Sequence, residues 1–110
     1  MNKIQYAVAA TLLISMPVTV FSAGNAIEGQ NKSVVCHACH GASGKSTQPI
    51  YPNLGGQHRD YLSKSMHAFR DGERQNAIMS GFAANLSDAD IEDIAAWYAS
   101  QQGLTEIKDK

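Results

Sequence analysis

Two cysteines and a histidine form the most specific chemical motif in this sequence. Cys36 and Cys39 are separated by two residues, and His40 follows directly, in "VVCHACHG". This spacing occurs in redox dithiols, in half of a zinc site, and at sites of covalent haem attachment. The residues around the motif must therefore decide among three unrelated chemistries.

The surroundings argue against the first two chemistries. A redox dithiol needs its first cysteine at a helix N-terminus, usually beside a βαβ unit, but here the motif ends a predicted helix and no strand precedes it. A structural zinc site needs four ligands at paired spacing. His58 and His67 are separated by eight residues and lack that pairing.

Haem attachment needs what the motif supplies. Two thiols bond to the two vinyl groups of the haem, and the histidine after the second cysteine becomes an axial ligand of the iron. We predict these roles for Cys36, Cys39 and His40. Because the chain has no other cysteine, we expect one covalently bound haem c as its cofactor.

The iron face opposite this histidine needs a second ligand or stays open. Met79 lies in a predicted loop, which can cover the face of a ring, and we predict it as the second axial ligand. Met66 lies on a helical stripe, where core packing is the simpler role. His58 and His67 are expected at the surface, and His37, inside the motif, is expected to point away from the iron.

Two strong axial ligands leave no position for oxygen or a substrate. Thioether sulfur also favours ferrous iron and raises the reduction potential relative to two histidines. This ligand pair is typical of an electron carrier, so we do not expect an enzyme.

Three helices are predicted to position these groups. The first spans 25–36, with Asn25 as its cap and Ile27, Val34 and Val35 on one face. The second spans 60–70. The third begins after Ser87, because a serine with an acidic residue three positions later is a typical helix start. Its predicted buried stripe consists of Ile91, Ile94, Ala95 and Tyr98. Long loops are predicted over 41–57 and 71–86, the second with a short helical turn inside it as an alternative, and we find no strand pattern.

The first 22 residues have the layout of a secretory signal peptide. Lys3 precedes an apolar stretch over 6–16, and the small residues Ser22 and Ala23 suit a cleavage site. A retained membrane anchor is the alternative, but the polar residues and proline leave the stretch short of the roughly 20 apolar residues that a spanning helix needs. We predict a signal peptide over 1–22, export to the periplasm, and a mature domain over 23–110.

The composition of this mature chain is ordinary, but its size is small. Loss of Lys3 leaves eight basic and ten acidic residues, a net charge of −2 with no basic stripe, which argues against nucleic-acid binding. Small exported domains commonly need a disulfide or a bound group for stability. A disulfide between two cysteines this close in sequence would close too short a loop to stabilise the fold. Two long loops in so small a domain suggest packing onto a non-protein group.

The mature chain resembles the class I c-type cytochromes, in particular the short monohaem bacterial branch and single halves of dihaem relatives. The resemblance rests on "GQNKSVVCHACHG", "YPNLGGQHRDYLSKSMHAFRDGER" and "IMSGFAANLSDADIEDIAAWYAS". It implies the all-α cytochrome c fold, with about three main helices and two long loops around one haem. It also implies that the first and last helices cross near Gly29 and the region of Trp97 or Tyr98.

The resemblance has implications for the site. Met79 matches the family's axial methionine, and the carbonyl of Pro52 is implied to accept a hydrogen bond from Nδ1 of His40, which orients the ring. Five residues are candidates for contact with the haem propionates, and the sequence does not choose among them: Tyr51, Gln57, Arg59, Arg70 and Arg74.

The implied function is one-electron transfer in the periplasm. We expect transient docking with larger redox proteins or respiratory complexes as donor and acceptor, and no membrane insertion after signal cleavage. Three alternatives stay open: a haem-based ligand-binding or peroxidase-like protein, a dedicated cytochrome subunit of a periplasmic oxidoreductase complex, and a thiol–disulfide protein with free Cys36 and Cys39.

Overall fold

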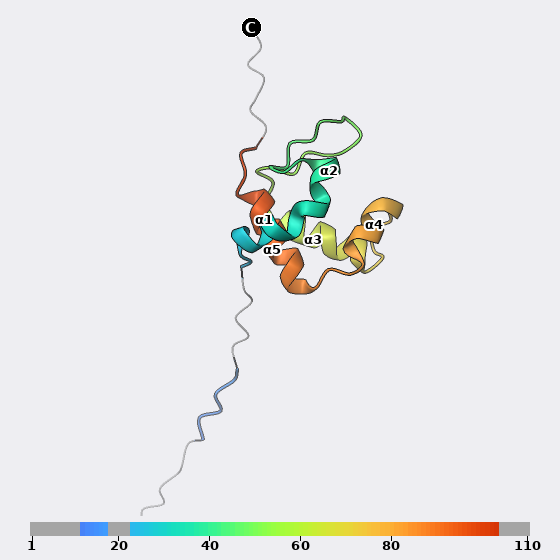
Figure 1. The fold of residues 1–110 in the computed structure, drawn as a ribbon. Coiled ribbons are helices and arrows are strands. Elements are labelled where there is room, and N and C mark those ends of the chain that lie inside the picture. Colours follow the sequence, from blue (N-terminus) through green and yellow to red (C-terminus); the bar gives the residue numbers. More distant parts are fainter. Residues whose placement is uncertain (1–11, 18–22, 104–110) are drawn as a thin grey trace, which may run out of the picture.

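The computed structural model describes residues 12–17 and 23–103, and every ordered element in these ranges is helical (Figure 1). The all-α cytochrome c prediction is confirmed. In chain order the elements are α1 (Ala26–Lys32), the 3₁₀ helix η1 (Ser33–Cys36), α2 (His37–His40), α3 (Arg59–Arg70), α4 (Ala77–Ala83) and α5 (Asp88–Ala99).

The first predicted helix is realised as α1, η1 and α2 in direct succession. The Asn25 side chain accepts hydrogen bonds from the backbone N–H groups of Ile27 and Glu28, as its cap role predicts. The run ends at Gly41, whose φ of 78° lies in the left-handed region that favours glycine. A Cβ at Gly41 would lie 2.3 Å from the carbonyl oxygen of Lys45, so this turn also leaves no room for a side chain.

The apolar side chains of this first segment are exposed. The sequence places Ile27, Val34 and Val35 on one face, and 71%, 62% and 60% of their surfaces are exposed. The buried residues are Gly29 and Ser33. At Gly29, α1 passes so close to α5 that a larger side chain has no space.

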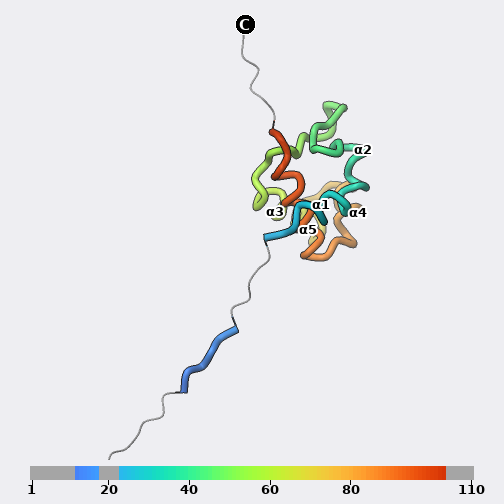
Figure 2. Tube along the Cα trace, turned by 60° about the vertical axis from the view of Figure 1, so that its left-hand side comes forward, coloured from blue at the N-terminus to red at the C-terminus, as the bar shows by residue number. Residues whose placement is uncertain are grey.

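The crossing of α1 and α5 is confirmed near Gly29 (Figure 2). A Cβ at Gly29 would meet the carbonyl oxygen of Asp93 at 1.9 Å and Cβ of Trp97 at 2.9 Å. Lys32 pairs with Asp90 at 2.9 Å and with Asp93 at 2.6 Å, and Asp93 also accepts a hydrogen bond from the backbone N–H of Asn25. These contacts hold the start of the domain against its last helix.

The core lies between α3 and α5. Leu62, Ile94, Ala95 and Tyr98 are buried together there, which confirms the predicted stripe of α5. Ser87 and Asp90 form the capping box that begins α5. The helix ends at Ala99 with Ser100 as its cap, earlier than the Gly103 terminator suggested. Ser63 on α3 donates a hydrogen bond to the carboxylate of Glu92 on α5, and both residues are buried.

The segment over 71–86 contains a helix where we predicted a loop. α4 spans seven residues, and the side chain of Asn76 caps it by accepting hydrogen bonds from the N–H groups of Ile78 and Met79. In Figure 1, α4 lies at the edge of the domain next to α3, the helix with which it makes its main contacts.

The predicted signal peptide over 1–22 lies largely outside the described residues. Its described part, 12–17, is exposed and has no helical structure. No helix in 12–17 or 23–103 has both the length and the apolar character needed to cross a membrane.

Candidate functional site

A cavity of about 530 Å³ brings together four of the five predicted site residues, and Cys39 is not among those that line it. Its lining includes Cys36, His40, Pro52 and Met79, which come from η1, α2, the loop over 41–58, and α4. Its wall is mostly apolar, with Ile50, Leu54, Tyr61, Leu62, Met66, Phe69, Ile78, Ile94 and Tyr98 among the lining residues. The volume falls in the range of about 300–1,000 Å³ that holds small molecules and cofactors in proteins.

His40 is buried, and its orientation is fixed by a hydrogen bond. Its Nδ1 lies 2.9 Å from the carbonyl oxygen of Pro52, so the contact that the resemblance implied is present. Because a carbonyl can only accept, Nδ1 carries the hydrogen, and the other ring nitrogen, Nε2, presents its lone pair. The Tyr51 ring approaches the imidazole edge-on, with ring centroids 6.4 Å apart.

Cys36 and Cys39 form no disulfide with each other, and both are half-buried. Cys36 lines the cavity, and burial raises the pKa of its thiol, with a further contribution from Cys39. The neighbouring Cys39 thiol raises the pKa of the Tyr51 hydroxyl. A raised thiol pKa is the opposite of what an attacking redox thiolate requires.

Met79 lines the cavity, but from the third position of α4 and not from a loop. We predicted a loop at Met79, and this prediction is wrong because the residue lies in a helix. The residue reaches the cavity because α4 begins immediately before it, at the Asn76 cap. Met66 packs against the core, as predicted, and also lines the cavity, so the structure brings two thioethers to this wall.

The remaining histidines are engaged elsewhere. His58 is exposed at the start of α3, and Nε2 of His37 lies 3.1 Å from the Ser33 hydroxyl. Nδ1 of His67 accepts a hydrogen bond from the Arg70 guanidinium at 3.0 Å. In the part of the chain that the structure describes, no three His, Cys, Asp or Glu side chains converge as they would around a metal ion.

The structure separates the five residues left open for the haem propionates. Tyr51, Gln57 and Arg74 line the cavity. Arg59 instead donates to the carbonyl of Ala23 and to Asp60, and Arg70 donates to Asp71, Asp88 and the carbonyl of Leu86. Sequence reasoning did not single out several lining side chains, among them Ile50, Asn76 and Ile78, because only the fold brings them to one wall.

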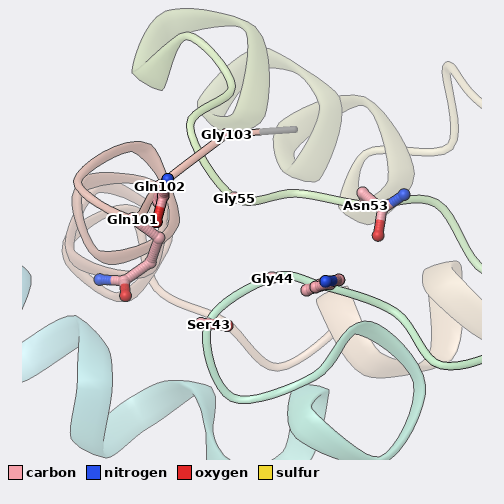
Figure 3. Close-up of a pocket in the computed structure, with 8 residues that line it drawn as sticks. Ser43, Gly44, Asn53, Gly55, Gln101, Gln102 and Gly103 are labelled. Carbon is pink, nitrogen blue, oxygen red and sulfur yellow. The ribbon is translucent and has the colours of Figure 1, made fainter. Parts of the chain in front are cut away.

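A second cavity, of about 440 Å³, lies where the loop over 41–58 meets the end of α5 (Figure 3). Ser43 and Gly44 line one side, Gly55 and Asn53 another, and Gln101 lies at the helix end. Polar and apolar atoms share its wall, and no predicted site residue lines it. Of the predicted motif, Cys36 and His40 line the first cavity.

The first cavity fits a haem by the chemistry of its donors. An imidazole nitrogen with its lone pair available, two thioethers, an adjacent pair of thiols and an apolar wall are the groups that c-type haem uses. Arg74 is the one cationic side chain among the described lining residues, and its guanidinium lies 4.7 Å from the centroid of the Phe69 ring.

Comparison with known proteins agrees with this geometry. Residues 23–102 match the family described as Cytochrome c. This chain belongs to the cytochrome c family. The resemblance on which the sequence analysis relied is thereby confirmed, and haem c is the cofactor that this domain implies.

Two curated relatives within this family are similar to the chain in sequence. Cytochrome c4 of Pseudomonas aeruginosa is 46% identical over 104 residues, which cover 93% of this chain and 50% of the relative. Cytochrome c-554(548) of Halomonas halodenitrificans is 51% identical over 83 residues, covering 73% of this chain and all of the relative. The chain thus spans about half the length of the cytochrome c4 relative and the full length of the shorter one.

A solved structure shows the same fold. Reduced recombinant cytochrome c4 from Pseudomonas stutzeri superposes with a TM-score of 0.71 and 42% identity, covering 74% of this chain and 48% of that one. This domain therefore has the cytochrome c architecture.

Proposed function

We propose that this chain is a one-electron carrier of the periplasm, with one haem c bonded to Cys36 and Cys39 and held between His40 and Met79. The observation that carries the proposal is the single apolar cavity whose lining includes Cys36, His40 and Met79. When bound, the haem supplies an iron that gains or loses one electron.

The protein's own residues give this site the properties of a carrier. The Pro52 carbonyl holds Nδ1 of His40, which leaves Nε2 to bind the metal. The thioether of Met79 is proposed as the opposite ligand and favours the reduced state. These features support electron transfer.

Three cavity residues are proposed to hold the haem propionates. Arg74 supplies a positive charge, and Tyr51 and Gln57 supply neutral hydrogen-bond donors. The stacking of Arg74 on Phe69 orients its guanidinium.

The cellular setting follows from the predicted signal peptide. We propose export to the periplasm with cleavage near Ser22 and Ala23, and brief docking with larger redox proteins as donor and acceptor. Interfaces of electron-transfer pairs are small because the carrier must leave quickly. The identity of these partners, and a role as a dedicated subunit of one oxidoreductase complex, are questions for capture experiments with the holoprotein.

The test is an optical spectrum of the exported holoprotein and of two methionine variants. We expect sharp low-spin bands, haem that stays with the protein in acid–acetone, and a far-red methionine-to-iron band. Met79→Ala should keep the haem attached, lose that band, lower the reduction potential and bind carbon monoxide when reduced.

Met66→Ala is the matched control. It should keep the far-red band and mainly cost stability, about 2 kcal/mol, at the lower end of large-to-small core substitutions because Met66 is only half-buried. Loss of the band in Met66→Ala, with retention in Met79→Ala, would reverse the assignment. A high-spin wild-type protein that binds carbon monoxide would instead indicate ligand binding, and extractable haem would exclude the thioether bonds.

A further inference from the structure

His40 is the last residue of the short helix α2, which does not by itself fix the position of the imidazole. α2 has only four residues and continues the run of α1 and η1, so few hydrogen bonds of its own fix the helix end that carries His40. Directly after His40 the chain reverses at Gly41. The position of the imidazole therefore depends on what holds the residues that follow.

Two adjacent aromatic side chains on α5 hold those residues. The Nε1–H group of Trp97 donates to the carbonyl of Ala42 at 3.0 Å, and the hydroxyl of Tyr98 donates to the carbonyl of Gly41 at 3.3 Å. These two carbonyls belong to the first two residues after His40. Tyr98 is only 1% exposed and lines the cavity, so one side chain touches both the cavity and the chain next to the histidine.

The end of α5 also holds the loop that carries Pro52. The backbone N–H of Gly56 donates to the carbonyl of Tyr98 at 3.0 Å. Leu54 and Gly55 donate from their N–H groups to the carbonyl of Gly44, and Figure 3 shows Gly44 and Gly55 facing each other beside the end of α5. The acceptor of the His40 ring is thus tied to the same helix end as the His40 backbone.

We propose that Trp97 and Tyr98 are positioning residues for the axial histidine: through the carbonyls of Ala42 and Gly41 they set where the His40 ring stands in the cavity. Pro52 sets the rotation of the ring, and the two aromatic donors set the place of its backbone. This inference rests on the proposed role of His40. The same two side chains also pack at the helix crossing. The variants must therefore remove the hydrogen-bond donor and keep the aromatic ring.

The test uses ferric holoprotein and proton NMR. The hyperfine shifts of the haem methyl groups depend on the orientation of the axial imidazole plane, and global stability alone does not move them. Tyr98→Phe keeps the ring and removes only the hydroxyl, and Trp97→Phe removes the indole N–H. Ser63→Ala is the control, because it removes a buried α3–α5 hydrogen bond that does not touch the segment after His40.

We expect both aromatic variants, and their combination most, to redistribute the methyl shifts and to shift the reduction potential, while Ser63→Ala leaves the methyl pattern as in wild type. Unchanged methyl shifts in Tyr98→Phe and Trp97→Phe would overturn the inference, as would an equal change in Ser63→Ala. Should Trp97→Phe not fold, the near-isosteric Tyr98→Phe decides the matter. A wild-type protein without low-spin haem signals would overturn the proposed function itself, which is a distinguishable result.

Discussion

Replacement of Gly29 by alanine should open the contact between the first and last helices. The new Cβ would lie 1.9 Å from the carbonyl oxygen of Asp93, whereas ordinary contact begins at 3.4 Å, so the helices must separate by about 1.5 Å. The obstacle is backbone, which no rotamer change can move aside. Overpacking of this kind costs about 1–3 kcal/mol or more.

The gain in helix propensity, about 1 kcal/mol for alanine over glycine, offsets only part of this cost. The separation would also strain the ion pairs of Lys32 with Asp90 and Asp93 across the same crossing. Because the clash is with backbone, we take the upper end of the overpacking range, and after the propensity gain we expect Gly29→Ala to lose about 2 kcal/mol of unfolding free energy.

The assay is guanidinium unfolding of the holoprotein, followed by far-ultraviolet circular dichroism. Gly81→Ala in α4 is the matched control, because a Cβ there meets nothing within 4 Å. That variant should be neutral or gain up to about 1 kcal/mol. The steric reasoning is refuted if Gly29→Ala unfolds within about 0.5 kcal/mol of wild type, the usual range for harmless surface changes.

Three further predictions concern the same framework. The hydrogen bonds of Lys32 lower the pKa of Asp90 to about 2 and also lower that of Asp93. The stability that these hydrogen bonds contribute is present above the ordinary carboxyl pKa of 3.8 and is lost as the pH falls towards 2. Lys32→Met should therefore flatten the dependence of unfolding free energy on pH between 4 and 2. An equally steep curve in the variant contradicts this. Ser63→Ala leaves the buried Glu92 carboxylate without its donor and should cost about 1–3 kcal/mol in denaturant unfolding, and a double-mutant cycle with Glu92→Ala should show coupling between the two positions. Ser87→Ala removes the cap of α5 and should cost about 1 kcal/mol in thermal unfolding, while an exposed change such as Asn85→Ala should not.

Local signals in the sequence predicted the parts of the fold that local physics decides. The caps at Asn25 and Ser87 and the stripe of α5 depend on neighbours a few residues apart, and all three are present in the structure. The contact between His40 and Pro52 could be inferred only through the family resemblance, since twelve positions separate the two residues.

The differences from the prediction have two physical reasons, close tertiary approach and short element length. Gly29 is buried because α5 comes too near α1 for a side chain to lie between them, while the apolar residues of the first segment are exposed. α4 was missed because seven residues are too few for a clear helical period, although the Asn76 cap was a usable sign. The donors Trp97 and Tyr98 lie 55 and 57 positions from their acceptors, a pairing that no local pattern records.

The placement of α4 gives the cavity two walls of unequal stiffness. The wall with His40 is tied to the last helix through side-chain and backbone hydrogen bonds, whereas α4, with Met79, packs mainly against α3, and residues 71–76 before it are exposed. Local opening takes least free energy where buried contacts are few. Amide hydrogens of α4 should therefore exchange with solvent well before those of α5, and any exchange of ligands at this site will begin on the methionine side while the histidine stays in place.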